Sequence, residues 1–309
     1  MFVEILVLVL GMGMLAYCSE KAVDHAISLA AAFGVSTIII GVLVVSIGTD
    51  LPEIVNSIIS SSMGHGDINV GDSIGSSLAQ ISLVLGLVGV ISGGFPVNRE
   101  DILELGRSTL MGLLLAILVF RSDYISRVDA SILIVGYLLL MVAMRHYLLK
   151  NNKEEMPRGA GSIFKHLTML SVFMAGVGLG SYLLVTSVIT ISRDLLIPEY
   201  IISFFAVAIG TSLPELVVDL AAVRKKEYEL AVGDVIGSCI VDSTMSIGIG
   251  ALLFPVAISG EMAFLSGIWT FVVSLIVFLS LWAARKIDKR MGIFFIALYL
   301  ASYAILFGF

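Results

Sequence analysis

The sequence predicts an all-α polytopic membrane protein with ten transmembrane helices arranged as two inverted five-helix repeats. Three observations predict this fold: an apolar composition, the spacing of the apolar runs and an internal repeat. Of the 309 residues, 58% are hydrophobic and 14% are charged, whereas soluble proteins carry about 25% charged residues. The composition excludes an ordinary soluble enzyme and a nucleic-acid-binding protein, and it makes the lipid bilayer the expected surroundings of the chain.

Ten apolar runs are separated by polar residues, and about 20 apolar residues are enough to cross a bilayer as a helix. The connections between the runs are short, so we expect a single membrane domain. The expected spans cover residues 2–18, 34–61, 69–93, 102–120, 127–149, 163–190, 198–223, 230–256, 260–283 and 290–308.

Two of these spans need a separate justification. The first has Glu4 instead of the basic start of a secretory signal, and Tyr17 is too large for the residue before a cleavage site, so we expect the span to be retained. The amphipathic stretch after it, SEKAVDHAISLAAAFG, is expected to extend its helix. The fourth span is the least apolar at its start, where Glu104 and Arg107 lie.

Lysine and arginine are distributed unevenly between the two sets of connections. Fifteen of the eighteen follow spans 1, 3, 5, 7 and 9, and the other three are Arg121, Arg127 and Arg193. The positive-inside rule places the richer set in the cytoplasm. We therefore expect an integral cell-membrane protein with both termini outside and the linker 151–162 in the cytoplasm.

The chain contains two copies of one unit. GTDLPE at 48–53 matches GTSLPE at 210–215, and VGDSIGSS at 70–77 matches VGDVIGSC at 232–239, both at an offset of 162 residues. The repeats are therefore 1–150, with its motif at 46–80, and 163–309, with its motif at 208–242. Each copy has five spans, and because this number is odd the second copy enters the membrane in the opposite orientation. This is the inverted-repeat plan of secondary transporters, whose site lies near the midplane of the membrane. A duplicated channel or an inert scaffold is the alternative, and we favour transport.

Seven carboxylates fall within the apolar spans, whereas no lysine or arginine lies deep in any of them. A buried charge costs several kcal/mol unless it is paired or protonated. The chain offers no side-chain partner, so a bound cation or proton is expected. The seven are Asp50, Glu53, Asp72, Glu215, Asp219, Asp234 and Asp242.

Four spans carry polar residues at helical intervals, so four helices present oxygen atoms to one region. The histidines lie in connections or at span ends. Oxygen-only sites favour hard cations such as Ca²⁺ or Na⁺ over zinc or copper. The stripes are Ser46, Thr49, Asp50, Glu53 and Ser57 in span 2; Ala208, Thr211, Ser212, Glu215 and Asp219 in span 7; Ser73, Ser76, Ser77 and Gln80 in span 3; and Asp234, Ser238 and Asp242 in span 8.

Pro52 and Pro214 each come directly before a glutamate of these stripes. A proline inside a helix removes the hydrogen bond to the carbonyl four residues earlier, here that of Gly48 or Gly210. Freed carbonyls can line a cavity and serve as ion ligands, and a packing kink is the alternative. The motif glycines have the spacing of closely packed helices and are assigned no chemistry: Gly71, Gly75, Gly233 and Gly237.

With these motifs the chain resembles the calcium/cation antiporter superfamily, and most closely the archaeal-type sodium/calcium exchangers. The resemblance rests on the two PE motifs, each followed by G-x-x-IGS, and it covers the whole chain; Asp72 and Asp234 replace the asparagine of the more usual GN-x-IGS. It implies that the four motif helices build a group of cation sites. It also implies that Ca²⁺ and Na⁺ are exchanged by alternating access as spans 1 and 6 slide past a core, without a cofactor or an obligatory protein partner.

The family's ligands carry over onto matching positions of this chain. The resemblance implies that Ca²⁺ binds to Glu53 and Glu215 with Thr49 and Thr211, and that no residue is catalytic. Further cation-binding positions fall on Asp50, Ser212, Ser76, Ser238, Gln80 and Asp242, and on the backbone carbonyls of Ser46 and Ala208.

The chain departs from the family pattern mainly by adding acids. Asp50 stands where the family usually has the serine that Ser212 retains, and Gln80 replaces an asparagine. Adjacent carboxylates disfavour joint ionisation, so H⁺ or K⁺ coupling is an alternative to Na⁺. Asp72, Asp219 and Asp234 are accessory acids near the site, and the alternative for these three is that they lie at water-filled helix ends and attract cations.

The sequence therefore predicts a Ca²⁺/Na⁺ antiporter, with a Ca²⁺/H⁺ or other cation/H⁺ antiporter as the alternative. An intramembrane aspartyl protease is disfavoured because the first glycine of its GxGD motif is replaced by Asn69 and by Ala231. A cation channel is disfavoured because deep paired carboxylates bind a divalent ion too tightly for conduction.

Overall fold

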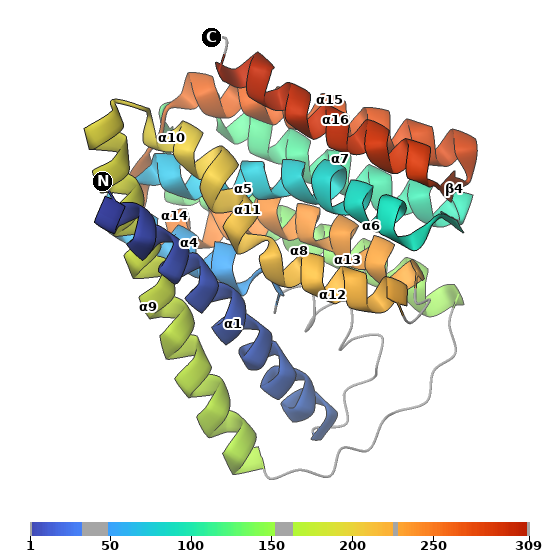
Figure 1. The fold of residues 1–309 in the computed structure, drawn as a ribbon, viewed down its shortest axis with the longest axis horizontal. Coiled ribbons are helices and arrows are strands. Elements are labelled where there is room, and N and C mark those ends of the chain that lie inside the picture. The colour runs from blue at the N-terminus through green and yellow to red at the C-terminus, as the bar shows by residue number, and fades with distance from the viewer. Residues whose placement is uncertain (1, 33–48, 152–162, 225–227, 308–309) are drawn as a thin grey trace.

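The computed structural model describes residues 2–32, 49–151, 163–224 and 228–307, and it is built almost entirely of helices (Figure 1). Within these residues, nine helices are long and apolar enough to cross a membrane. Their bounds agree with nine of the ten expected spans. Of the remaining one, span 34–61, the structure describes the second half as α4 (Leu51–Ser62), and residues 34–48 lie outside the described part. The prediction of an all-α polytopic membrane protein is confirmed.

Two long helices, α1 (Phe2–Ala32) and α9 (Ile163–Leu195), pack against each other along one side of the molecule (Figure 1). The expected extension of the first span is confirmed, because α1 is continuous to Ala32. The two backbones approach closely at Gly11 and Gly180, where an added Cβ would lie 3.0–3.1 Å from the other glycine's carbonyl oxygen. Small residues permit this kind of close crossing between membrane helices.

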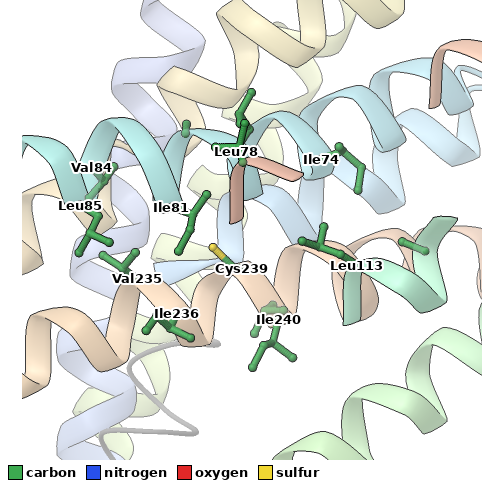
Figure 2. Close-up of a cluster of buried hydrophobic side chains, with 14 of the residues drawn as sticks. Ile74, Leu78, Ile81, Val84, Leu85, Leu113, Val235, Ile236, Cys239 and Ile240 are labelled. Atoms are coloured by element: carbon green, nitrogen blue, oxygen red, sulfur yellow. The ribbon is translucent and has the colours of Figure 1, made fainter. Parts of the chain in front are cut away.

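The centre of the molecule is formed by two helices that each contain a wider π-helical turn. One is α5 (Gly66–Leu78), η2 (Ala79–Val84) and α6 (Leu85–Ser92), and the other is α13 (Tyr228–Ile240), η4 (Val241–Ser246) and α14 (Ile247–Leu253). Figure 2 shows buried side chains of the first helix opposite those of α13, with Leu113 of α7 at one end. The labelled ones are Ile74, Leu78, Ile81, Val84, Leu85, Leu113, Val235, Ile236, Cys239 and Ile240.

These central helices meet at residues that the internal repeat relates. Ser77 Oγ donates to the carbonyl oxygen of Cys239, and Cys239 Sγ donates to the carbonyl oxygen of Ser77, both at 3.4 Å. The two residues are 162 positions apart, which is the offset of the repeat. A reciprocal contact of this kind is what a two-fold relation between two copies requires.

The other helices surround this centre. Figure 1 shows α7 (Arg99–Val119), α15 (Gly260–Ala284) and α16 (Lys289–Phe307) together on one side. On another side, α8 (Arg127–Asn151) packs against α14 and α7. Their outward residues include many exposed leucines, isoleucines and valines, as a lipid-facing surface requires. Across the central helices run α10 (Glu199–Ile202), η3 (Ser203–Val207), α11 (Ala208–Thr211) and α12 (Leu213–Arg224), and α11 and α12 also touch α1 (Figure 1).

Four two-residue strands, which the sequence analysis did not predict, join helix ends from opposite repeats. β1 (Phe95–Pro96) pairs with β4 (Lys286–Ile287), and β2 (Tyr124–Ile125) pairs with β3 (Val256–Ala257), both antiparallel. β2 and β4 are again 162 residues apart. The two pairs are thus equivalent contacts of the two repeats, and they tie the outer helices of one copy to those of the other.

Candidate cation site

The two PE motifs lie where helices begin. Asp50 precedes α4 with Pro52 in its first turn, and Ser212 separates α11 from α12, with Pro214 in the first turn of α12. Each proline therefore lies in the first turn after the interruption, and the bond that Pro214 cannot donate to the carbonyl of Gly210 coincides with the break at Ser212. The physical reason is that proline needs no N–H partner in a first turn.

Both repeats adopt the same local geometry at this point. Asp50 has φ −76° and ψ 6°, and Ser212 has φ −82° and ψ 9°. The next turn then presents Glu53 in one repeat and Glu215 in the other. An interrupted backbone at membrane depth is tolerated where it is buried in protein or lines a cavity, and both interruptions are buried.

The two helix starts bring three acids together. One carboxylate oxygen each of Asp50, Glu53 and Glu215 lies within 4.8 Å of the others, and all three side chains are fully buried. Oxygen ligands on opposite sides of a Ca²⁺ ion lie roughly 4.8 Å apart, at about 2.4 Å each from the metal. No ion pair with lysine or arginine reaches this group from the described residues, so the geometry fits a divalent cation held by oxygen alone.

Hydroxyl groups from both repeats adjoin this group. Ser76 of α5 lies 3.3 Å from Glu53 Oε1 and 3.3 Å from the Thr211 hydroxyl. Thr211 donates to Asp72 Oδ1 at 2.9 Å. If Thr211 gives its proton to Asp72, its oxygen lone pairs are directed toward Ser76 and the interior of the site. The serine and threonine oxygens are thereby oriented as acceptors, which is the arrangement that a bound cation needs.

The acid at position 72 is held by a residue that the sequence analysis did not single out. Asn56 Nδ2 donates to Asp72 Oδ2 at 2.5 Å, and Asn56 Oδ1 accepts a hydrogen bond of 3.3 Å from the hydroxyl of Ser181. Asn56 follows Glu53 by three residues, so helical spacing could have indicated it. Ser181 belongs to α9 and carries no sequence signal. The chain of contacts connects α9 to the site through Asn56 and Asp72.

Replacing Ser181 by alanine is expected to slow transport without weakening Ca²⁺ binding. The change removes a hydrogen bond worth about 1 kcal/mol, which connects α9 to the core and touches none of the three clustered carboxylates. We expect the maximal rate of uptake to fall about three- to fivefold while the half-saturating Ca²⁺ concentration stays unchanged. The control is Ser187→Ala on the same helix, where the hydroxyl bonds only to its own helix at Leu183. Equal rates for the two variants would contradict the connection.

The remaining predicted site residues are buried around the same region. Gln80 and Asp242 lie in the two π-helical turns. Ser238 faces the Asp50 carboxyl, and the Ala208 carbonyl lies 3.5 Å from Ser76 Oγ. Ser46 lies outside the described residues. Those of the predicted residues that the structure describes are all buried: Thr49, Asp50, Glu53, Ser76, Gln80, Ala208, Thr211, Ser212, Glu215, Ser238 and Asp242.

The three accessory acids do not lie at water-filled helix ends. Asp72 is 1% exposed, Asp219 is fully buried and Asp234 is 3% exposed. The alternative interpretation of these residues is therefore wrong. The reason is that α5, α12 and α13 are covered by other helices at these positions, which their local hydrophobicity did not reveal.

The sequence and the structure both have relatives of known family. The family model described as sodium/calcium exchanger protein matches residues 3–145 and 165–308. The chain belongs to the sodium/calcium exchanger family. It is 33% identical over 302 residues to a membrane protein of Methanocaldococcus jannaschii, covering 96% of this chain and 95% of that one. It is 27% identical to the sodium/calcium exchanger MaX1 of Methanosarcina acetivorans, with 99% of each chain covered.

Solved structures of one exchanger share this fold. A structure of the sodium-calcium exchanger NCX_Mj, soaked with Na⁺ and Sr²⁺, superposes with a TM-score of 0.68 at 30% identity and covers 98% of both chains. The structures of NCX_Mj describe extracellular ion exchange and induced binding-site occlusion in that exchanger. The resemblance to archaeal-type exchangers that the motifs predict is confirmed for the family and the fold.

Proposed function

We propose that this protein is a secondary antiporter that exchanges Ca²⁺ for Na⁺. The observation that carries the proposal is the group formed by Asp50, Glu53 and Glu215, which is buried between the two repeats and converges within 4.8 Å. Membership of the sodium/calcium exchanger family supports the same assignment. The group contains neither histidine nor cysteine, as a site for hard cations requires.

Exchange follows from competition for the same oxygen atoms. Several buried carboxylates without a basic partner are costly when empty, so the loaded site is far more stable than the empty one. The protein therefore changes its open side with either Ca²⁺ or Na⁺ bound, and each ion must be replaced before the next transition. In this proposal Glu53, Glu215, Thr49 and Thr211 hold Ca²⁺, and Na⁺ uses these and the neighbouring hydroxyl and carbonyl oxygens.

The moving part in this proposal is the pair α1 and α9. These two helices pack chiefly on each other, and α1 touches the core beside the site, where Met12 fills the space next to Gly210. A shift of the pair along the core would uncover the site on one side and cover it on the other, as alternating access requires. The hydrogen bond from Ser181 to Asn56 would then couple a movement of α9 to Asp72, which Asn56 contacts.

The orientation is a further part of the proposal. Fifteen of the eighteen basic residues follow the odd-numbered spans, which supports a cytoplasmic location for residues 151–162 and for the connection between α12 and α13. Both chain ends would then lie outside. The repeats 1–150 and 163–309 would enter the membrane in opposite directions around the shared site.

Na⁺-loaded liposomes containing the purified protein are expected to take up ⁴⁵Ca²⁺ when they are diluted into Na⁺-free medium. Competition at one site predicts that K⁺-loaded liposomes show only background uptake, and that external Na⁺ suppresses the signal. Protein-free liposomes loaded with Na⁺ are the control. Uptake that is independent of internal Na⁺ would contradict sodium coupling.

Proton-coupled cation exchange is the second candidate. The observation that favours it is Asp50, an extra carboxyl within the converging group. If liposomes with an acidic interior and no Na⁺ take up ⁴⁵Ca²⁺, and if Asp50→Ser abolishes this uptake, the coupling ion is H⁺ and the proposed exchange must be revised accordingly.

A further inference from the structure

Two histidines from distant parts of the sequence meet between α1 and α9. The Nδ1 atoms of His25 and His166 lie 3.0 Å apart, and the two ring centroids are 5.2 Å apart. Both residues lie outside the repeated motifs, and they are separated by 141 positions instead of 162. The symmetry of the two copies therefore does not require this pair, and cation exchange at the carboxylates does not use it.

The pair lies beyond the part of α1 and α9 that a bilayer covers. His25 follows Gly11 by fourteen residues, and His166 precedes Gly180 by fourteen, so both lie about 21 Å from the crossing of the two helices. Gly11 is near the middle of the span Val3–Ala22, and half of the hydrocarbon core is about 15 Å thick. In Figure 1 these ends of α1 and α9 extend away from the other helices, so ions in water can reach the half-buried pair.

The two imidazoles are held with their nitrogen atoms directed at each other. Only one of two nitrogens in contact can carry the hydrogen, so the other presents a lone pair. Among the described residues, the polar partner of each imidazole is the other imidazole. His25 also stacks on Phe173 of α9, with ring centroids 5.8 Å apart and planes at 15°, which restricts the orientation of its ring. Two nitrogen ligands on different helices are thus positioned in advance around one point.

The distance between the nitrogens matches neighbouring ligands of one metal ion. Imidazole nitrogens bind zinc and similar metals at about 2.0–2.1 Å, so two of them are about 2.9 Å apart at a right angle and about 3.3–3.4 Å apart at a tetrahedral angle. The observed 3.0 Å is closer to the right angle of square-planar or octahedral coordination, which is typical of Cu²⁺ and Ni²⁺. Ca²⁺ prefers oxygen ligands, so it does not compete for this pair.

The surrounding charges do not exclude a divalent cation. In residues 19–32 and 163–170, which hold the pair, Glu20 and Asp24 balance Lys21 and Lys165. The ammonium group of Lys21 lies 3.3 Å from a carboxylate oxygen of each of the two acids. The described helix ends therefore carry no net positive charge that would repel the ion.

We infer that His25 and His166 bind a divalent transition-metal ion of the Cu²⁺ or Ni²⁺ type, with water completing its coordination. The bound ion joins α1 to α9 at a second point, about 21 Å from their crossing. With the proposed orientation this site faces the cytoplasm, because residues 151–162 lead into α9. The side depends on that orientation, whereas the binding depends on neither the orientation nor the exchange of Ca²⁺.

The test measures equilibrium binding of ⁶³Ni²⁺ to the purified full-length protein without a histidine tag, at slightly alkaline pH. Ca²⁺ in excess keeps Ni²⁺ away from the carboxylate group. We expect about one Ni²⁺ per chain, which Cu²⁺ displaces, as the general order of metal affinities requires. His25→Gln and His166→Gln should each weaken Ni²⁺ binding at least about tenfold, because the second imidazole binds the same ion as an intramolecular step.

His65→Gln is the matched control. It removes another half-buried histidine, whose Nδ1 lies 2.7 Å from a carboxylate oxygen of Glu199 instead of another imidazole, and it should bind Ni²⁺ as the wild-type protein does. Ni²⁺ should raise the melting temperature of the wild-type and His65→Gln proteins but not of the two pair variants, because a ligand of the folded state stabilises it. Melting curves without metal show whether each variant is folded.

Each outcome decides the inference. A folded wild-type protein that binds neither Ni²⁺ nor Cu²⁺ overturns it and leaves the pair as an N–H···N hydrogen bond. Binding that survives His166→Gln, or that is lost equally in His65→Gln, also overturns it, because the ion then lies elsewhere. Failure of the exchange proposal has a different signature, namely no Na⁺-dependent ⁴⁵Ca²⁺ uptake by the wild-type protein.

Discussion

Replacing Glu53 or Glu215 by glutamine is expected to abolish Na⁺-driven Ca²⁺ uptake. Glutamine keeps the shape of the side chain and removes one negative charge from a group whose oxygen atoms lie within 4.8 Å of one another. Removing one partner from a buried charge interaction costs about 3 kcal/mol or more, which corresponds to at least roughly a hundredfold loss of affinity. The measurement is initial ⁴⁵Ca²⁺ uptake by Na⁺-loaded liposomes.

The same substitutions should separate binding from folding. Without cations the three carboxylates repel one another, so the wild-type protein in a chelator should unfold at a lower temperature than either glutamine variant. Adding Ca²⁺ should raise the melting temperature of the wild-type protein, because a ligand that binds only the folded state stabilises it. The variants should show little of this shift. Glu261→Gln, at the exposed start of α15, is the control, and full uptake by Glu53→Gln would contradict the assigned site.

The fold class could be predicted because the features that define it can be read directly from the sequence. The apolar runs fix the spans by length, and the GTDLPE and GTSLPE copies fix the repeat by their offset. The repeat also explains contacts that could not be foreseen individually, such as the reciprocal bonds between Ser77 and Cys239. The offset of 162 residues relates Glu53 to Glu215, and each lies in the first turn of a regular helix, as its position in the PE motif predicts.

Other features depend on tertiary packing and left no readable pattern. The π-helical turns that carry Gln80 and Asp242 break the four-residue spacing used to place them. Ser181 is one of many small polar residues on α9, and only the neighbouring Asn56 distinguishes it. The burial of Asp219 and Asp234 depends on how α12 and α13 are covered by other helices. An inference from one helix alone cannot contain that information.

Replacing Gly75 by alanine is expected to damage both folding and transport. A Cβ at Gly75 would lie 2.1 Å from the carbonyl oxygen of Phe204 and 2.8 Å from the Cβ of Ala208. Neither contact is the end of a flexible side chain, so α5 must move away from η3 and α11. Overpacking of this kind costs about 1–3 kcal/mol and sometimes more, and we expect a lower melting temperature and a larger aggregated fraction in size-exclusion chromatography.

Gly233 provides the matched control for this prediction. It is the first glycine of the G-D-x-IGS motif of the second repeat, equivalent to Gly71 at the offset of 162, and an added Cβ there meets no described atom within 4 Å. Gly233→Ala should therefore be neutral or slightly stabilising, since alanine is the better helix former by up to about 1 kcal/mol. If the two variants were equally stable, the close crossing of α5 with η3 would not be a constraint on the fold.

The position of Gly75 also links helix packing to ion binding. Ser76 is the next residue, and its hydroxyl lies 3.3 Å from both Glu53 and Thr211. A displacement of α5 by a few tenths of an ångström or more would open the contact between the repeats at the site, so folded Gly75→Ala protein should bind Ca²⁺ more weakly than the Gly233→Ala protein. Because both variants add a single methyl group, a difference in Ca²⁺ affinity between them would show that the small residue at 75 sets the distance between the ligands of the two repeats.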